Sequence, residues 1–596
     1  MKQHNPREYY TNTLRSNEQK SNKARKVSRW IGVIRMLLFL FFCYSIYLIA
    51  NETSPWIILF SIIPYIALHL FDIKFQAYSD DLDTLIDILK TEINSLDGDL
   101  SNHYDGKEFT DHKHEYSHDL EIFGPNSLFQ FINRTATKEG AENLAKLLET
   151  TLRSEEEIIE LQEANRELSP LIEWRHQLRI PSWKKEVALT PMIESANKYE
   201  SIIQHRWQII AATFLTTTNI TIILLSSFSL INPAFAIITV LSLLLATGLI
   251  TAQMNKRLLF IDGTYKSMMS IHKILMLIHH QAPLFKSHKL KRITEPLCND
   301  NNSFITEVKE LNKILSALDQ RSNLVVNILL NGLYLRDFWV THRTDRWFKK
   351  NKHQIEIWSK NLAELDALCA LSHIAYHYPE TAYPTPSSST IMDTEEMIHP
   401  LIFKTKAIGN PLHIKQDHLI HIITGANMAG KSTYLRTVGA NLIFASVGAP
   451  VFASYMTFKP SALFSSMRSS DQLSEGISFF HAELLRLKQM KQHMQTHSNT
   501  FILLDEILKG TNSKDKLKGS EIVLEKILEY PASGIVATHD LELKKLEETF
   551  PTHFKNFCFE FEYQDEKIIF DYILRKGATE KMNASYLLEK IFLTDQ

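Results

Sequence analysis

The stretch Thr-Gly-Ala-Asn-Met-Ala-Gly-Lys-Ser-Thr carries residue types that bind phosphate groups. It contains the spacing Gly-x-x-x-x-Gly-Lys-Ser, with the glycines at Gly425 and Gly430 and the polar pair at Lys431 and Ser432. The apolar run at 419–423 predicts a buried strand, and the residues after the glycines predict the start of a helix. Such a turn directs backbone N–H groups at an anion, and the helix N-terminus adds partial positive charge. The stretch therefore predicts a phosphate-binding loop for a nucleoside triphosphate.

The side chains of this loop have distinct expected roles. Lys431 is expected to act in catalysis by reaching the β- and γ-phosphates, and Ser432 is expected to ligate Mg²⁺. ATP and Mg²⁺ are therefore the predicted cofactors. A chance glycine-rich turn is the alternative, which the flanking strand and helix patterns disfavour. The loop residues predicted to contact the nucleotide are Gly425, Ala426, Asn427, Met428, Ala429, Gly430, Lys431, Ser432 and Thr433.

Two further apolar runs end in residues suited to hydrolysis. The run at 500–504 is followed by Asp505 and Glu506. Asp505 is placed to hold the magnesium ion together with the loop serine, and Glu506 is placed to polarise the attacking water. The run at 535–538, which follows an intervening helix, leads to His539, a candidate contact for the γ-phosphate or the attacking water. Together these groups predict an ATPase that converts ATP and water to ADP and phosphate.

The whole chain has 596 residues, of which 44% are hydrophobic and 22% are charged, and its net charge is -2. This length predicts two or more domains, and the charge balance gives no global reason to expect nucleic-acid binding. Four scattered cysteines without metal-ligand spacing indicate a reducing compartment. Four histidines within residues 101–118 fit no standard metal site, so this stretch is interpreted as a solvated linker.

Four apolar segments predict two helical hairpins through a membrane: Ile31–Ala50 with Trp56–Phe71, and Ile209–Ile231 with Ala234–Met254. A full span needs about 20 residues, so the second segment is short. Basic residues flank the hairpins and are absent from their short loops, which places the N-terminus and the nucleotide domain in the cytoplasm. We therefore predict a multi-pass protein of the cell inner membrane. Buried core helices are the alternative, and it is credible for the short segment alone.

Composition shifts suggest the order of the remaining parts. Two basic clusters, at 286–292 and 343–352, either contact phosphates of nucleic acid or lipid or form solvated helix faces. The predicted order is a basic cytoplasmic tail at 1–29, a transmembrane hairpin at 30–73, a helix and linker at 74–118, a helical core at 119–206, a second hairpin at 207–255, a second part of the helical core or lever at 256–378, a linker at 379–396 and the ATPase domain at 397–596.

Further motifs resemble the MutS family of DNA mismatch repair proteins. Asn427-Met428 in the phosphate loop is characteristic of that family, and Asp505-Glu506 continues as Ile-Leu-Lys-Gly-Thr, similar to the family's Asp-Glu-x-x-x-Gly-Thr. Residues 473–484 resemble its Ser-Thr-Phe-x-x-Glu signature. Asn410-Pro411 resembles the segment beside adenine, and residues 574–586 resemble the closing Gly…Ser-Tyr element. The resemblance is dense over residues 397–591 and thin over residues 119–376.

The resemblance implies an α/β P-loop NTPase domain of the ABC/MutS type. An all-α core or lever domain precedes it, combined in this chain with the two transmembrane hairpins. It also implies a homodimer in which Ser478 of one subunit completes the nucleotide site of the other, with Asn410 beside the nucleotide. The implied partner is DNA, without mismatch specificity, in mismatch-repair-like or recombination-related processes.

The chain departs from the family pattern in several places. Ala426 and Ala429 stand where Pro and Gly are usual, and Ala407 replaces an aromatic that stacks on adenine, a role that Tyr572 would take. No mismatch-reading domain is visible, and the second hairpin interrupts the helical core. The main alternative is an ABC-type ATPase that drives transport or another membrane process without DNA, but the Leu-Ser-Gly-Gly-Gln signature is absent. A third is a protein that uses ATP only to dimerise, against which Glu506 argues.

Overall fold

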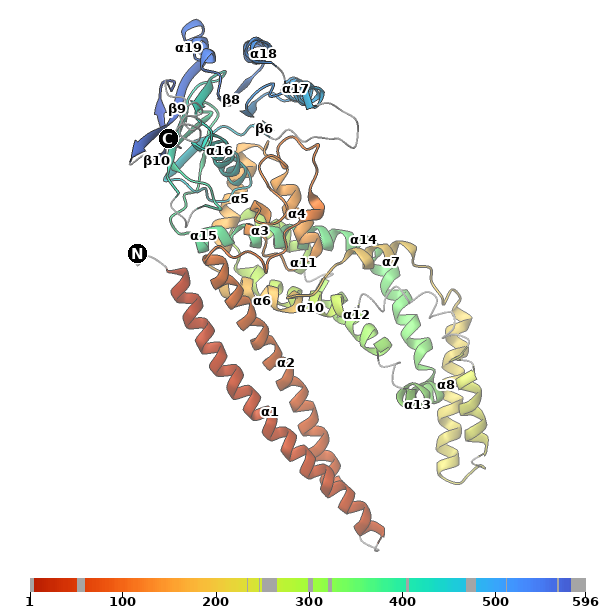
Figure 1. The fold of residues 1–596 in the computed structure, drawn as a ribbon. Helices are drawn as coiled ribbons and strands as arrows, with labels where there is room; N and C mark the ends of the chain where they lie inside the picture. Colours follow the sequence, from red (N-terminus) through yellow and green to blue (C-terminus); the bar gives the residue numbers. More distant parts are fainter. Residues whose placement is uncertain are drawn as a thin grey trace. The chain divides into compact units, whose positions relative to one another are not determined.

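The computed structural model of the protein (Figure 1) describes residues 5–50, 59–232, 234–245, 247–248, 265–298, 304–319, 324–402, 407–467, 479–510, 512–564 and 567–579. The chain divides into two compact units. The first comprises Met1–Arg134, Leu144–Ile172 and Leu368–Gln596, and the second comprises Thr135–Asn143 and Glu173–Ala367. The mixed α/β class expected for the C-terminal part and the helical class expected for the N-terminal part are both confirmed.

A six-stranded sheet forms the centre of the C-terminal domain within the first unit (Figure 1). Its order is β10-β9-β4-β8-β7-β6, with β10 antiparallel to β9 and all other neighbours parallel. The Ile, Leu and Val runs of the central strands are buried on both faces, as is typical of parallel strands covered by helices. The strands are β4 (Ile420–Gly425), β6 (Ala462–Ser466), β7 (Thr500–Asp505), β8 (Ala532–Thr538), β9 (Phe554–Gln564) and β10 (Lys567–Lys576).

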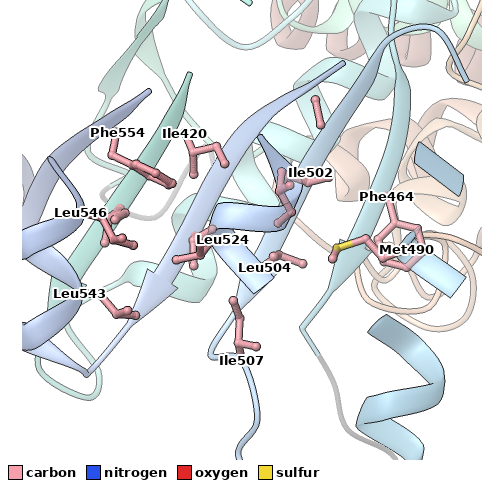
Figure 2. Packing of buried hydrophobic residues seen from close by; sticks show 14 of the residues in the cluster. Ile420, Phe464, Met490, Ile502, Leu504, Ile507, Leu524, Leu543, Leu546 and Phe554 are labelled. Atoms are coloured by element: carbon pink, nitrogen blue, oxygen red, sulfur yellow. The ribbon is translucent and has the colours of Figure 1, made fainter. Parts of the chain in front are cut away.

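Apolar packing fixes the strand ends of this sheet against helices. Figure 2 shows one cluster, in which Ile420 of β4 and Ile502 and Leu504 of β7 lie with Met490 and Leu524, which come from two helices. Full burial of one such side chain stabilises the folded state by about 1.5–3 kcal/mol. The sheet is therefore a rigid base for the residues at its strand ends. The helices of this domain are α16 (Lys431–Ser446), α17 (Phe479–Thr496), α18 (Ser513–Ile527) and α19 (Lys545–Thr549), with the 3-10 helix η8 (Leu541–Lys544).

A second, four-stranded sheet in the same unit includes residues that we predicted to be a linker. Its order is β1-β5-β2-β3. The predicted linker at 379–396 contributes β1 and most of β2, so that prediction is wrong for these residues. The strands are short and partly polar, and they are defined by pairing with distant segments rather than by their own pattern. They are β1 (Thr385–Pro386), β2 (Met392–Met397), β3 (Asn410–Ile414) and β5 (Tyr455–Phe458).

The histidine-rich stretch at 101–118 is packed, so the expectation of a solvated linker is wrong. His103 and Tyr116 are buried. The carbonyl oxygen of Glu115 accepts a hydrogen bond from the backbone N–H of Ser465 at 3.0 Å and another from the Arg486 guanidinium at 2.7 Å. The stretch therefore lies against β6 and α17 of the nucleotide domain.

Two long helices of the first unit, α1 (Pro6–Ala50) and α2 (Leu59–Leu96), lie side by side (Figure 1). Asp83 of α2 accepts hydrogen bonds from Ser21 and from Arg25 of α1, at 2.6 and 2.7 Å. Arg35 makes an ion pair with Asp72 at 2.6 Å. These polar contacts fix the register of the two helices. The other helices of this unit are η2 (Lys107–Phe109), α3 (Leu128–Ile132), α5 (Glu155–Leu168) and α15 (His373–His377).

Two helices among the described residues are long and apolar enough to cross a membrane, by length and composition alone. They are Pro6–Tyr47 and Arg206–Ser227, and a shorter apolar helix covers Ala234–Leu245. In each of the two helices, 11% of the long apolar window is buried inside the protein. The predicted segments Trp56–Phe71 and Ala234–Met254 lie partly outside the described residues.

The second unit is helical. Asp366 of α14 (Arg336–Leu371) is buried. Its carboxylate accepts hydrogen bonds from the backbone N–H groups of Ala136 and Thr137 and from the Thr137 hydroxyl, at 2.7–3.0 Å. This carboxylate fixes the turn that precedes α4. The helices are α4 (Lys138–Leu148), which begins in this unit, α6 (Ile172–Arg179), η3 (Ile180–Ser182), α7 (Thr190–Lys198), α8 (Arg206–Ser227), α10 (Tyr265–Gln281), η4 (Ala282–Leu284), α11 (His288–Cys298), α12 (Phe304–Asp319), α13 (Leu324–Tyr334) and α14 (Arg336–Leu371).

Candidate nucleotide-binding site

A cavity of about 610 Å³ opens where β4, β7 and β8 end. This volume is in the range that holds a small-molecule ligand or cofactor. Because the carboxyl ends of parallel strands meet at one edge of the sheet, residues far apart in the sequence converge here. The predicted site residues that line the cavity are Asn410, Ala426, Asn427, Met428, Gly430, Lys431, Ser432, Thr433, Asp505, Glu506 and His539.

The glycine-rich loop connects β4 to α16 with the geometry of an anion site. Gly425 ends the strand, and Gly430 adopts a left-handed φ of 103° directly before the helix begins at Lys431. A Cβ at Gly430 would lie 3.1 Å from the ring of Tyr572. Glycine therefore permits both the left-handed backbone conformation and the close approach of this ring. The first N–H groups of an α-helix have no partner within the helix, so those of α16 are available to an anion bound at the loop. Ala429, which also belongs to the loop, is buried and does not line the cavity.

Lys431 lies in the first turn of α16 and points back into the loop. Its Nζ donates to the carbonyl oxygens of Gly425 at 2.7 Å and Ala426 at 2.9 Å, and it lies 3.5 Å from Nε2 of His539. Burial lowers the pKa of Lys431 to about 8, and the charges of Asp505 and Glu506 only partly offset that effect. The lysine is therefore held in place for a phosphate group but is easily deprotonated.

The low pKa of Lys431 predicts a pH-dependent nucleotide affinity. Below pH 8 the ammonium is charged and available to the phosphates, whereas above pH 8 binding requires proton uptake. We expect ATP affinity to fall up to about tenfold per pH unit above pH 8, measured by calorimetry between pH 7 and 9.5. Lys431→Arg is the control, because its guanidinium stays charged and its affinity should not change over this range. A wild-type affinity that is constant from pH 7.5 to 9.5 would contradict the assignment.

The two predicted metal ligands lie side by side. The Ser432 hydroxyl donates to Oδ2 of Asp505 at 2.5 Å, from the first turn of α16 to the end of β7. A hydroxyl and a carboxylate form an all-oxygen donor set, the kind that Mg²⁺ prefers. The donor set thus fits magnesium at the edge of the phosphate loop.

Glu506 follows β7 in a left-handed conformation with φ of 63°, which is strained for a residue with a side chain. Its Oε1 accepts a hydrogen bond from Lys516 at 2.6 Å, and Lys516 also lies 3.4 Å from Asp540. Burial acts to raise the pKa of Glu506, but the hydrogen bond and charge of Lys516, with a smaller effect of His539, outweigh burial and lower it. The carboxylate therefore stays ionised while held by one cation.

Lys516 is the functional candidate that the sequence interpretation missed, since one lysine in a lysine-rich helix carries no signal of its own. Its contact predicts that Lys516→Gln raises the pKa of Glu506, because burial then dominates. The acid limb of the pH–rate profile for phosphate release should move to higher pH, with a several-fold loss of rate near pH 5. Lys526→Gln, which breaks an exposed pair with Glu529, is the matched control. An unchanged acid limb in Lys516→Gln would show that this contact does not set the pKa.

His539 follows β8 and faces the loop lysine. Burial lowers its pKa first, and the neighbouring Lys431 lowers it further. The imidazole is therefore neutral near pH 7 and able to donate or accept a hydrogen bond. Its place beside Lys431 and near Glu506 puts it at the phosphate end of the cavity.

Residues of β3 and β10 also line the cavity. Asn410 lines it, but its amide is bound to the β10 backbone, donating to Tyr572 O at 2.9 Å and accepting from Leu574 N–H at 2.7 Å. Asn410 therefore positions Tyr572, which also lines the cavity. The sequence interpretation did not name the neighbouring lining residues Met397, Ile398, His399 and Ile402. Ser478, predicted to act from the other subunit, lies outside the described residues.

Comparisons with known proteins relate the C-terminal part of the chain to one family. Residues 421–591 match MutS domain V. DNA mismatch repair protein MutS of Ehrlichia ruminantium (strain Welgevonden) is 32% identical over 291 residues, 48% of this chain and 34% of that protein. The MutS of Aquifex pyrophilus is 36% identical over 188 residues (31% and 22%), and human MutS protein homolog 4 is 28% identical over 235 residues (38% and 24%). The matches thus span about a third or less of these relatives.

Proposed function

Because the C-terminal domain of this chain belongs to the MutS family, we propose that the protein binds Mg·ATP in the cavity and hydrolyses it. One observation carries the proposal. A lysine, a serine–aspartate pair, a glutamate and a histidine converge on one cavity from α16 and from the ends of β7 and β8. This set supplies phosphate binding, a metal site and a base for water in one place.

The residues divide the reaction among them. Lys431 exchanges its loop carbonyl partners for the phosphates, while the N–H groups of the loop and of α16 bind phosphate oxygens. Ser432 and Asp505 would hold Mg²⁺, and the ion would supply positive charge beside the phosphates. Glu506 orients the attacking water and accepts its proton, and His539 contacts the γ-phosphate. Tyr572 stacks on the adenine, because Ala407 occupies the position where relatives carry an aromatic residue for this role.

We further propose that the active form is a homodimer with composite sites. Glu506 and His539 both line the cavity, and we infer that a second subunit reaches the γ-phosphate beside them. In this proposal Ser478 of the partner reaches that phosphate and completes the site. Closing and opening of the dimer with the nucleotide state then moves the helical second unit.

The proposed location is the cell inner membrane, with the nucleotide domain in the cytoplasm. Exposed apolar side chains along α1 and α8 support this location, among them Phe39, Leu40 and Phe214, whose exposed fractions are 54%, 56% and 67%. Such surfaces are unfavourable in water over this length. Basic residues of the N-terminal tail remain on the cytoplasmic side.

DNA is the proposed partner, in a mismatch-repair-like or recombination-related process, because relatives of the C-terminal part carry the mismatch repair name. The test is ATP hydrolysis by the full-length protein in lipid nanodiscs, with no DNA, single-stranded DNA, duplex and mismatched duplex. We expect hydrolysis that duplex DNA changes severalfold without preference for the mismatch. Hydrolysis that no DNA form changes would reject the DNA role and favour a transport or other membrane process.

A further inference from the structure

A buried group of one carboxylate and two imidazoles lies in the first unit, and none of the three lines the nucleotide cavity. Glu92 comes from α2, and His373 and His377 come from α15, where they occupy positions i and i+4. This spacing places both imidazoles on the same helix face. The exposed fractions of Glu92, His373 and His377 are 0%, 3% and 3%. Ionisable side chains are rarely buried so completely unless they are paired or bind a metal ion.

The distances within the group suit a metal ion better than hydrogen bonds. Oε2 of Glu92 lies 3.5 Å from Nε2 of His373 and 3.5 Å from Nε2 of His377. Hydrogen bonds to a charged oxygen are shorter, about 2.7–2.9 Å. Ligands held about 2.0–2.1 Å from a tetrahedral zinc ion lie about 3.4 Å apart. All three ligand atoms lie within 4.8 Å of one another.

Neighbouring side chains orient the three groups. The Tyr10 hydroxyl of α1 lies 3.2 Å from Nδ1 of His377, which leaves Nε2 directed at the carboxylate. Nε of Arg134 donates to both oxygens of Glu92, at 3.0 and 3.1 Å. Hydrogen bonds of this kind to the far side of a ligand are typical around protein-bound metals. Arg134 balances the charge of Glu92, so a fourth, anionic ligand such as hydroxide suits the open position.

We propose that Glu92, His373 and His377 bind one zinc ion, which holds their two helices together. Two imidazoles and one carboxylate are a ligand set that zinc accepts, whereas Mg²⁺ and Ca²⁺ prefer oxygen alone. The ion links α2, and through Tyr10 also α1, to the short helix that precedes the nucleotide domain. Zinc binding therefore stabilises the packing of the helical hairpin against the segment that leads into the nucleotide domain.

The test is metal content of the full-length protein, purified in detergent, dialysed against zinc and then against metal-free buffer. We expect about one zinc per chain by mass spectrometry, and expect it to be lost in His373→Gln and in His377→Gln. His497→Ala is the matched control, because His493 and His497 form another i,i+4 pair, with ring centroids 4.2 Å apart, that is not among the possible metal-binding groups of the described residues. Its zinc content should equal that of the wild type.

A second measurement keeps the test decisive if a variant fails to fold. Cobalt added to the metal-free wild type should give the intense visible spectrum of a four-coordinate site, and zinc should raise its melting temperature relative to chelator. Wild-type protein that retains no zinc and shows neither response would overturn the proposal. So would equal zinc content in the wild type and His373→Gln. Either result would leave the Glu92–Arg134 ion pair as the whole role of the group.

Discussion

Glu506→Gln should lower the rate of ATP hydrolysis by about 10²–10⁴-fold while leaving ATP affinity nearly unchanged. Glutamine has the same shape and can still accept the hydrogen bond from Lys516, but it cannot take a proton from water. Glu506 follows β7 and is not part of the phosphate loop, so the lysine, the serine and the loop N–H groups still bind the nucleotide. Single-turnover phosphate release and equilibrium binding, measured on the same preparation, separate the two effects.

Glu542→Gln is the control for this substitution. Glu542 lies in the same domain, but its carboxylate makes an exposed pair with Lys545 and does not line the cavity. Its hydrolysis rate should match the wild type. If Glu506→Gln hydrolysed ATP at the wild-type rate, another group would have to activate the water, and the catalytic assignment would be wrong.

Gly534→Ala should destabilise the nucleotide domain by about 3 kcal/mol. Gly534 lies in β8 opposite Ile502 of β7 and Ile420 of β4, at the centre of the sheet. A Cβ at this position would lie 2.0 Å from the carbonyl oxygen of Ile502 and 2.8 Å from its backbone nitrogen. Because both are main-chain atoms held by the ladder, the strands must move apart. The site residues at the ends of β7 and β8 would then lose their geometry.

The thermal midpoint of the nucleotide domain in the full-length protein measures this effect. Gly519→Ala in α18 is the matched control, because a Cβ there meets only the flexible end of Leu508, and alanine favours a helix over glycine by about 1 kcal/mol. We expect a small shift for Gly519→Ala and a large fall for Gly534→Ala. Equal midpoints would mean that the sheet accommodates a methyl group at Gly534.

The candidate site could be predicted from the sequence wherever a short motif follows an apolar strand. Lys431, Ser432, Asp505, Glu506 and His539 each follow or adjoin such a strand, and parallel strands bring their ends to one edge of the sheet. In open sheets of this kind, ligands bind outside the carboxyl ends of the strands. Local pattern and fold class together were therefore enough to predict that these residues lie around one cavity.

Contacts between distant segments could not be predicted in this way. The contact of Lys516 with Glu506 depends on how α18 lies on the sheet, and the Glu92–His373 contact joins residues far apart in the chain. Strands β1 and β2 are stabilised mainly by pairing with distant segments, so their Pro-rich and polar composition resembled a linker. These features are products of tertiary packing, and single-sequence patterns do not encode which partners meet.

The central claim is that this cavity hydrolyses Mg·ATP through the loop lysine. The most direct test is phosphate release by the full-length wild type and by Lys431→Ala, both in lipid nanodiscs, with Mg²⁺ added and with Mg²⁺ removed by chelation. We predict phosphate release by the wild type only when Mg²⁺ is present, and background release by Lys431→Ala under both conditions. Equal phosphate release by the two proteins, or none from either with Mg²⁺ present, would contradict the claim.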